Sequence, residues 1–279
     1  MADILFIADF FVDQVSGGGE LNNDVLMDNL YKRGYSIRRI NSHQVCHLDL
    51  MHNKKIIVSN FINLSEQNRK DLQGRDYIIY EHDHKYLPNR NPNVYPNYQA
   101  PREHIINREF YANASAVLCQ STFHAEIAKK NLELDNIISL GGNMWSEDHF
   151  ALLEQICKDP QREARHAIMQ SSTLHKNTRE AMQYCEALEL EYMLIPPSEP
   201  STFLKKLGSC STLVFFPKTP ETLSRIVVEA RMMGMGTKTT NNVGAIHEDW
   251  FSKKGLDLIE EMRYKQEEIV NIVLRALNA

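Results

Sequence analysis

Two glutamates near the C-terminal end of the chain, Glu221 and Glu229, have the spacing that most suggests chemistry. Seven residues separate them in the segment FFPKTPETLSRIVVEA, which leads from an apolar strand into a helix that we predict over Thr222–Met233. If both residues are helical, they lie roughly 12 Å apart along the axis and about 80° apart around it, so both border one cleft. Carboxylates accept hydrogen bonds from hydroxyls. The pair therefore suits a ligand with hydroxyls at two places.

The start of this predicted helix could bind an anion between those hydroxyls. Free N–H groups at a helix N-terminus attract anions, and Thr222, Leu223 and Ser224 would supply them. A nucleotide sugar carries a diphosphate between its ribose and its transferred sugar, and so matches the arrangement. The alternative is structural: Thr219 as N-cap and Pro220 as first helical residue make an ordinary helix start, with one glutamate complementing the dipole and the other on the surface.

A glycine-rich turn, Gly17-Gly18-Gly19-Glu20, follows the first apolar strand and opens a helix. Glycine lets the backbone approach a ligand closely, and the helix start suits an anion. The segment is neither GxGxxG nor a P-loop, because no GK[ST] follows. The structural alternative is a tight strand-to-helix turn that needs glycine.

The segment Glu81-His82-Asp83-His84 follows the apolar strand Tyr77–Tyr80. The carboxyl end of a strand in a doubly wound sheet faces the ligand-binding crevice. A carboxylate beside a histidine at such a place could act as a base in general acid–base chemistry. A polar strand exit with a hydrogen-bonded histidine is the alternative.

The connection from residue 84 to 102 is rich in proline and asparagine, which excludes a regular element. A loop of this length in a compact domain is usually functional or disordered. Cations alternating with aromatic rings suit phosphates, bases and sugars, and here they are Lys85, Arg90 and Arg102 among Tyr86, Tyr95 and Tyr98. A solvated loop is the alternative.

Metal and disulfide chemistry find little support. The cluster His43, Cys46, His47 and His52 fits no standard zinc spacing, and we expect no metal site. The five cysteines are scattered, odd in number and without a CxxC pair, which indicates a reducing compartment.

Strand-length apolar runs alternate with amphipathic helical segments, which predicts parallel sheets covered on both faces. In the first half, the predicted strands are Ile4–Phe10, Tyr35–Ile40, Lys55–Ser59, Tyr77–Tyr80, Ala116–Cys119 and Ile137–Leu140. The helices predicted between them are Glu20–Arg33, Glu66–Leu72, His104–Ala112 and Thr122–Asn131. This is the pattern of a doubly wound domain.

The pattern restarts after a predicted helix over Glu147–Lys158 and a break at Asp159-Pro160. Further strands are predicted over His166–Gln170, Tyr192–Ile195, Thr212–Phe216 and Thr237–Thr240, with helices over Asn177–Leu188 and Ser201–Leu207 among them. The chain closes on a long amphipathic helix, Leu256–Leu277. We therefore predict an N-terminal Rossmann-like domain over 1–145, a shorter one over 146–255 and a closing helix over 256–279, with ligands bound in the cleft where the two domains face each other.

The bulk properties limit the classes of partner. The net charge is -5 and the pI about 6.1, so no broad cationic face for nucleic acid or anionic lipid is expected, although a local basic groove is compatible with these values. The N-terminal segment lacks the basic region of a signal peptide, and no apolar run approaches the ~20 residues of a membrane span. We expect a cytoplasmic protein without a membrane span.

Taken together, the GGGE turn, the two spaced glutamates and the closing helix resemble glycosyltransferases of the GT-B fold, especially the large retaining family often numbered four. The resemblance spans almost the whole chain. The short length and the segments YIIYEHDHKY and EDWF resemble compact glycosyltransferases of tailed bacteriophages. That resemblance implies the cytoplasm of a host cell and, as acceptor, 5-hydroxymethylcytosine in DNA, a base that must leave the stack to be modified.

The resemblance assigns roles to matching residues. Glu221 would contact the donor sugar and Glu229 the ribose, while Gly18 and Gly19 would lie near the phosphates and reacting centre. The family has an Arg followed five residues later by a Lys that neutralise the diphosphate; Lys176 matches the Lys, but Ser171 stands in place of the Arg. Arg179 or Arg225 is the candidate to replace it, and Thr222-Leu223 replaces a usual glycine pair.

We therefore expect a metal-independent, retaining hexosyl- or pentosyltransferase that uses a UDP-sugar without a cofactor, since the DxD pair of metal-dependent enzymes is absent. In the family, a histidine near the end of the strand Tyr77–Tyr80 contacts the donor sugar or the acceptor, and the resemblance assigns that role to His82 first and His84 second. His82, Glu221 and Lys176 are the predicted catalytic residues. The predicted donor-binding residues are Gly18, Gly19, Lys176, Glu221, Thr222, Leu223, Ser224 and Glu229, and the predicted acceptor-binding residues are Glu20, His84, Lys85, Tyr86 and Arg90. The alternatives are a glycan or small-molecule acceptor, a nucleotide-sugar epimerase, and a non-catalytic nucleotide-sugar-binding protein.

Overall fold

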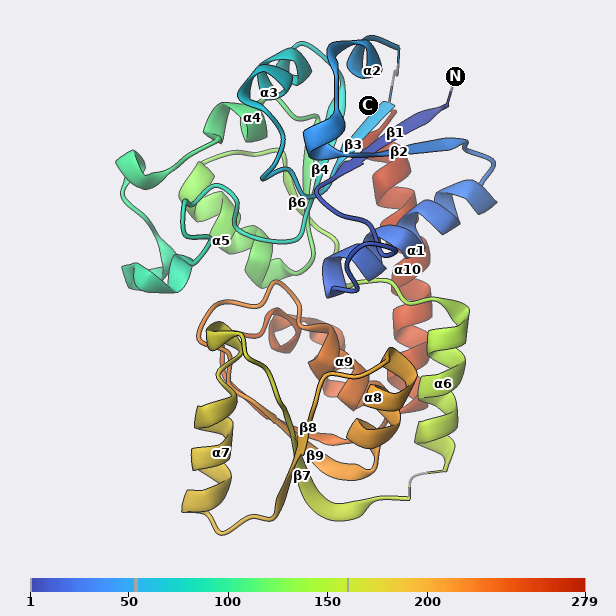
Figure 1. Ribbon diagram of the computed structural model, residues 1–279, viewed down its shortest axis with the longest axis vertical. Helices are drawn as coiled ribbons and strands as arrows, with labels where there is room; N and C mark the ends of the chain where they lie inside the picture. Colours follow the sequence, from blue (N-terminus) through green and yellow to red (C-terminus); the bar gives the residue numbers. More distant parts are fainter. Residues whose placement is uncertain (1, 53–54, 160, 279) are drawn as a thin grey trace. The chain divides into compact units, whose positions relative to one another are not determined.

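The computed structural model describes residues 2–52, 55–159 and 161–278. The chain divides into two compact units (Figure 1). The first comprises Met1–Met144 together with Lys265–Ala279, and the second comprises Trp145–Tyr264. The change of unit at residues 144 and 145 lies beside the boundary predicted at 145 and 146, whereas the closing helix predicted as a separate segment is divided between the units.

The first unit is built on a parallel sheet of order β2-β1-β3-β4-β5-β6. Its strands are β1 (Ile4–Ala8), β2 (Ile37–Asn41), β3 (Lys55–Val58), β4 (Tyr77–Glu81), β5 (Ala116–Cys119) and β6 (Ile137–Ser139). Side chains of β1 and β4 are buried at every position, as expected for central strands covered on both faces. The strand order reverses between β1 and β3, which is where doubly wound sheets bind ligands.

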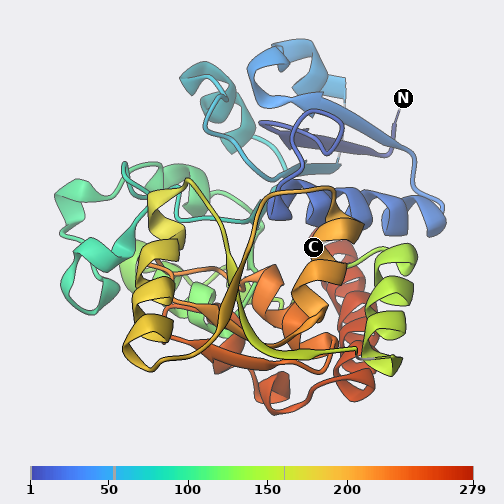
Figure 2. The same cartoon turned by 60° about the horizontal axis from the view of Figure 1, so that its bottom comes forward.

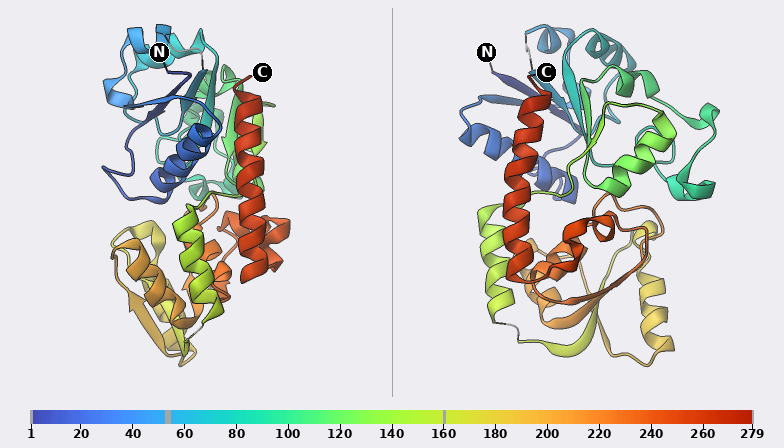
Figure 3. Two further views of the ribbon diagram at one scale, coloured as in Figure 1. Left: turned by 90° about the vertical axis from the view of Figure 1, so that its right-hand side faces the viewer. Right: turned by 180° about the vertical axis from the view of Figure 1, so that it is seen from behind.

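Helices cover both faces of this sheet. They are α1 (Gly18–Lys32), α2 (His47–His52), α3 (Glu66–Gln73), α4 (Arg108–Ala112) and α5 (Thr122–Leu132). Leu26 and Leu30 of α1 pack on one face together with Ile269 and Val273 of the closing helix α10 (Leu256–Ala276), which is continuous from one unit into the other (Figure 3). The other four helices contribute to the core on the opposite face.

The second unit has a smaller parallel sheet of order β10-β9-β7-β8. Its strands are β7 (Glu163–Met169), β8 (Tyr192–Ile195), β9 (Cys210–Phe215) and β10 (Gly236–Thr239), and its helices are α6 (Glu147–Lys158), α7 (Thr178–Ala187), α8 (Pro200–Gly208), α9 (Arg225–Met232) and the first part of α10. Ala181 and Cys185 of α7 pack on one face, whereas Leu204 of α8 and Val227 of α9 pack on the other (Figure 2). The order reverses between β7 and β9.

The alternation of strands and helices predicted from the sequence is confirmed in both units, but two predicted helices start too early. The helix predicted over His104–Ala112 is helical only from Arg108, after a single 3₁₀ turn at Arg102–His104. The helix predicted from Thr222 begins at Arg225. The closing helix contains no membrane span, and no other helix in the described ranges is long and apolar enough to be one.

Candidate functional site

A pocket of about 360 Å³ lies in the first unit at the reversal of strand order. Its lining comes from the ends of three strands and the start of α1: Asp9 and Phe10 after β1, Gly19 and Glu20 in α1, Asn60, Ile62 and Asn63 after β3, and His82, Asp83 and Arg90 after β4. The carboxyl ends of neighbouring parallel strands meet at one edge of the sheet. The pocket therefore brings together four residues selected from the sequence, Gly19, Glu20, His82 and Arg90.

The glycine turn fits closely around two pocket side chains. A Cβ on Gly19 would lie 3.4 Å from the imidazole of His82, and a Cβ on Gly17 would lie 2.3 Å from the Glu20 carboxylate. Larger residues at either position would push His82 or Glu20 aside. The glycines therefore serve close packing around these two side chains, while Gly18 is the exposed first residue of α1.

His82 is held by neighbours on both sides of its ring. Nε2 lies 2.7 Å from Oδ1 of Asn23, Nδ1 contacts the side-chain amide of Gln120, and the ring meets that of Tyr80 edge-on with centroids 5.0 Å apart. The orientation of His82 is thus fixed from α1, β4 and the end of β5. Both ring nitrogens are therefore engaged by protein side chains, and the ring lines the pocket in a fixed orientation.

Asp9 organises the loop after β3. Its carboxylate accepts hydrogen bonds of 2.9 Å from the backbone N–H groups of Ile62 and Asn63, and another from the hydroxyl of Ser42. The side chain is nearly buried. Asp9 therefore adds a negative charge to the pocket while its oxygens are occupied by protein donors.

Glu20 has fewer donors than Asp9, namely its own backbone N–H and the side chain of Asn60. The amide of Asn60 lies 3.4 Å from Oε1, a long hydrogen bond. Burial raises the pKa of Glu20, and the charge of Asp9 raises it further. Glu20 is therefore the carboxylate in the pocket with capacity left for a ligand hydroxyl.

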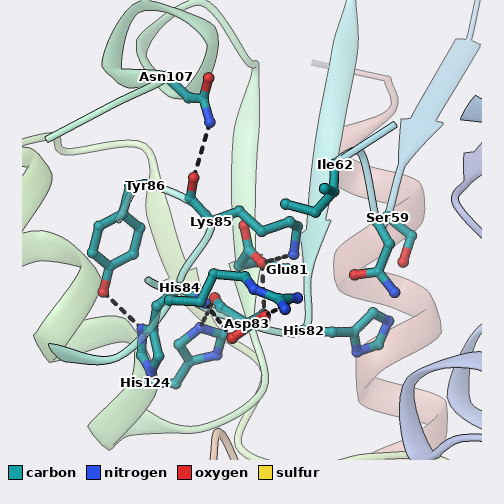
Figure 4. A network of polar contacts seen from close by, with 12 residues as sticks. Ser59, Ile62, Glu81, His82, Asp83, His84, Lys85, Tyr86, Asn107 and His124 are labelled. Atoms are coloured by element: carbon teal, nitrogen blue, oxygen red, sulfur yellow. Dashed lines mark hydrogen bonds and ion pairs between the residues drawn. The ribbon is translucent and has the colours of Figure 1, made fainter. Parts of the chain in front are cut away.

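The buried ion pair of Glu81 and Lys85 helps to orient the residues that follow β4 (Figure 4). The Lys85 ammonium contacts Oε1 of Glu81, and both side chains are about 1% or less exposed. Tyr111 donates its hydroxyl to the same carboxylate, and the backbone N–H of Asp83 donates to it over 2.9 Å. Lys85 also lies 5.4 Å from the ring centroid of Phe61. The network ties the turn that carries His82 and Asp83 to the core.

The structure corrects the prediction that His84, Lys85 and Tyr86 contact an acceptor. All three are buried, and Nδ1 of His84 lies 2.7 Å from the Tyr86 hydroxyl, on the side of the segment facing away from His82 (Figure 4). Burial, together with the nearby charge of Lys85, lowers the pKa of His84 well below its ordinary value. These side chains therefore support the loop from within.

Arg90 keeps its candidate role, because its exposed guanidinium lies at the pocket and forms an ion pair of 3.1 Å with Asp83. Its backbone has a φ of 52°, which is uncommon for a residue other than glycine. The segment from 84 to 102 forms a loop with 3₁₀ turns at Pro92–Val94 and Pro96–Tyr98.

In the second unit, Lys176 and Glu221 form an ion pair at the reversal of strand order. The Lys176 ammonium lies 2.8 Å and 3.0 Å from the two carboxylate oxygens of Glu221. Two hydrogen bonds join the loops that carry them: the N–H of Lys218 donates to the carbonyl of His175, and the amide of Asn177 donates to the carbonyl of Phe216. The pair is partly exposed and so can reach a ligand.

The expected helical geometry of the two glutamates is wrong. Glu221 is extended, forms a bridge to Val243 and donates its N–H to Asn242, so Thr219 and Pro220 do not start a helix. Leu223 is fully buried in the core of the unit, which leaves its side chain no contact with a donor. The helix start that can face an anion is Ser224 and the residues after it.

Ser224 sits at the N-cap of α9 in a strained conformation, with φ of 76° and ψ of 86°. Its hydroxyl is buried and has no hydrogen-bond partner in the described chain. Buried polar groups are normally paired. An unpaired hydroxyl beside the free N–H groups of α9 therefore marks a place suited to an anionic or hydroxylated ligand.

Glu229, in the second turn of α9, is buried among three potential donors that converge on one oxygen. The Trp145 indole donates to Oε1 over 2.9 Å, Arg225 lies 3.5 Å from the same atom, and Nε2 of His149 lies 3.2 Å away without hydrogen-bond alignment. Burial opposes ionisation, but these contacts prevail and lower the pKa of Glu229 to about 2. The Trp145 indole, the Arg225 guanidinium and the His149 ring thus all lie at Oε1 of Glu229.

Trp145 and His149 were not identified from the sequence, and neither were Asp9, Asn60, Ile62 and Asn63. Arg225, one of the two candidates for the missing arginine, stacks on Trp145 at 4.7 Å and is directed to Glu229, while Arg179 is an exposed residue of α7. Within the described ranges, no group of three or more His, Cys, Asp or Glu side chains is arranged to hold a metal ion.

Comparison with known proteins supports the fold. No protein-family model and no curated protein sequence matches the chain. Among solved structures, Anabaena HepE in complex with UDP and glucose aligns over 100% of this chain and 94% of its own, with 12% identity and a TM-score of 0.53. An α-glucosyltransferase in complex with UDP and a 13-mer DNA containing an HMU base aligns over 98% and 91%, with 11% identity and a TM-score of 0.54. The chain shares with both proteins the GT-B fold, an α/β architecture of parallel sheets.

Proposed function

We propose that the protein is a glycosyltransferase that takes a sugar from a UDP-sugar and transfers it to an acceptor hydroxyl. One observation carries the proposal: the buried carboxylate of Glu229, whose pKa its contacts through Oε1 lower to about 2, lies in the same helix as the unpaired buried hydroxyl of Ser224 at the helix start. A carboxylate and a helix start at this spacing suit a nucleotide ribose and its diphosphate. The fold shared with proteins solved with UDP or UDP-glucose supports this assignment.

In the second unit we assign three contacts to the donor. Glu229 accepts hydrogen bonds from the ribose hydroxyls, the start of α9 and Lys176 face the diphosphate, and Glu221 accepts from hydroxyls of the sugar. In the unliganded chain, Lys176 and Glu221 satisfy each other. A bound donor would offer the ammonium a phosphate and the carboxylate a hydroxyl, so their pairing keeps both groups near the positions that the ligand needs.

Transfer forms a bond between the acceptor oxygen and the anomeric carbon of the sugar and breaks the bond from that carbon to UDP. The leaving diphosphate gains negative charge, which Lys176 and the α9 N–H groups stabilise. The hydroxyl proton passes to the leaving phosphate, so no separate metal or cofactor is required. We also propose that the transferred sugar keeps its configuration at the anomeric carbon.

The pocket in the first unit is the proposed acceptor site, with Glu20 as the group that orients the hydroxyl and the fixed ring of His82 as part of the wall. The residues His82, Glu20 and Arg90 surround it. Hydroxymethylated cytosine in DNA is the acceptor favoured by the sequence resemblance. The α-glucosyltransferase of the same fold, solved with DNA containing an HMU base, supports a DNA acceptor. A glycan or small molecule is the alternative acceptor.

Incubation with UDP-[¹⁴C]glucose and an acceptor panel tests the proposal. The panel contains a DNA duplex with 5-hydroxymethylcytosine, the same duplex with cytosine, and a glycan mixture. We expect label to enter one acceptor and Glu221→Gln to abolish transfer, while Glu191→Gln, an exposed glutamate of the same unit, leaves it intact. Label in hydroxymethylated DNA alone identifies the acceptor; absence of both transfer and UDP binding would contradict the proposal.

A further inference from the structure

The pocket in the first unit carries an excess of negative charge. Asp9, Glu20 and Asp83 contribute three carboxylates to its lining, whereas Arg90 is the sole lysine or arginine among the described lining residues and is already paired with Asp83. Lys85, the nearest buried cation, is neutralised by Glu81. Burial and the charge of Asp9 raise the pKa of Glu20, as expected where negative charges gather with little solvent.

The rest of the lining suits an uncharged group. Phe10 and Ile62 are 43% and 50% exposed, high values for large apolar side chains, and they provide apolar surface beside the carboxylates. Asn60 and Asn63 add amide groups that hydrogen-bond hydroxyls. A mixture of apolar wall and a few polar groups is typical of pockets for small neutral ligands, and the volume of about 360 Å³ lies at the lower end of their range.

We infer that this pocket takes an uncharged, hydroxyl-bearing group and excludes a phosphate from the same place. This inference rests on the proposed function, because it specifies the acceptor of that reaction. Glu20 accepts the hydrogen bond of the incoming hydroxyl, since its carboxylate receives only its own backbone N–H and the long hydrogen bond from Asn60 among the described contacts and so keeps acceptor capacity. A DNA acceptor would thus enter as an extruded base, with its backbone phosphates outside the pocket.

The side-chain methyl group of Ile62 provides a local reporter. The full-length protein, ¹³C-labelled at isoleucine methyls, is titrated with methyl glucoside, 5-hydroxymethyl-2′-deoxycytidine and glucose 6-phosphate. We expect at least one neutral probe to shift the Ile62 signal and the phosphorylated sugar to bind at least about tenfold more weakly, or by ~1.4 kcal/mol. The quantity compared is the ratio of the dissociation constant of glucose 6-phosphate to that of the neutral probe. We expect Glu20→Gln to lower this ratio and Glu20→Lys to bring it below one. Glu126→Lys, on the exposed face of α5, should leave it unchanged.

Equal or tighter binding of glucose 6-phosphate overturns the inference, as does an Ile62 signal that responds to no neutral probe at its solubility limit. A ratio unaffected by Glu20→Lys, in a variant with unchanged circular dichroism, also overturns it. Titration with UDP distinguishes failure of this inference from failure of the proposed function. If UDP shifts the methyl signal of Ile226, in the first turn of α9, the proposed donor site is supported even when no probe binds the pocket as expected.

Discussion

The indole nitrogen of Trp145 and the carboxylate of Glu229 are 2.9 Å apart and both side chains are buried, although 84 positions separate them in the sequence. Trp145 holds one oxygen of the glutamate in place, and Arg225 stacks on the indole at 4.7 Å. The indole thus fixes both groups that flank the proposed ribose position. In the proposed function, the role of Trp145 is to position the carboxylate of Glu229.

We predict that Trp145→Phe weakens UDP binding about tenfold and lowers the free energy of unfolding by about 2–3 kcal/mol, because a buried ionised acceptor loses a donor. Isothermal calorimetry and urea denaturation measure the two effects. Trp250→Phe, at another buried tryptophan of the same unit, is the matched control. It should cost stability without changing UDP affinity; an equal loss of affinity in both variants would assign the effect to general packing.

The buried pair of Glu81 and Lys85 predicts strong coupling. Lys85→Met leaves an uncompensated carboxylate and should destabilise the first unit by about 3–5 kcal/mol. Adding Glu81→Gln should recover most of this loss, since an amide still accepts from Tyr111. Urea denaturation of both single variants and the double variant completes a double-mutant cycle. Additive losses would show that the two charges do not act as a pair.

The pair of Lys176 and Glu221 predicts the opposite pattern, a large effect on turnover with little on stability. The two side chains are 29% and 14% exposed, so Lys176→Met should change the free energy of unfolding by less than about 1 kcal/mol. Turnover should fall about 10²-fold, because a cation that stabilises the leaving diphosphate is lost. Lys206→Met, at an exposed lysine of α8, provides the control. Unchanged turnover in Lys176→Met would remove Lys176 from the donor site.

Acid should destabilise the first unit through His124. Burial lowers the pKa of His124 to about 3, while the unfolded chain titrates near 6.5, so the folded form holds the neutral ring. The contribution to stability is complete above pH 6.5 and is lost as the pH falls toward 3, by up to about 5 kcal/mol. Chemical denaturation from pH 7 to pH 4 should show a shallower slope for His124→Gln than for wild type or the exposed-site variant His52→Gln. Identical slopes would contradict the assignment.

The sequence predicted the two sheets well because buried parallel strands leave continuous apolar runs, as in Ile4–Ala8 and Tyr77–Glu81. Residues that directly follow a strand, such as His82, could be placed by the same reasoning. The start of α9 could not be predicted, because the local sequence resembles a helix cap. The bridge from Glu221 to Val243 is a long-range contact that overrides this local preference.

The burial of charged side chains was the second feature that could not be predicted from the sequence. Lys85 lies among polar and aromatic residues in the sequence, a pattern that indicates a surface cation. In the structure, Lys85 is buried and forms an ion pair with Glu81, whose carboxylate also accepts a hydrogen bond from Tyr111. The three neighbours of Glu229 come from two helices and the connection before one of them. No local signal joins such residues, because only the packed unit brings them together.

Binding of UDP to wild type, Glu229→Gln and Glu191→Gln is the most direct test of the donor site. Calorimetry gives the three dissociation constants, and UDP at 100 times its dissociation constant should stabilise wild type against unfolding by roughly 2.7 kcal/mol. The account predicts that Glu229→Gln weakens UDP binding at least about tenfold, or ~1.4 kcal/mol, while Glu191→Gln binds as wild type does. A wild-type protein that does not bind UDP, or a folded Glu229→Gln variant with unchanged affinity, would contradict it.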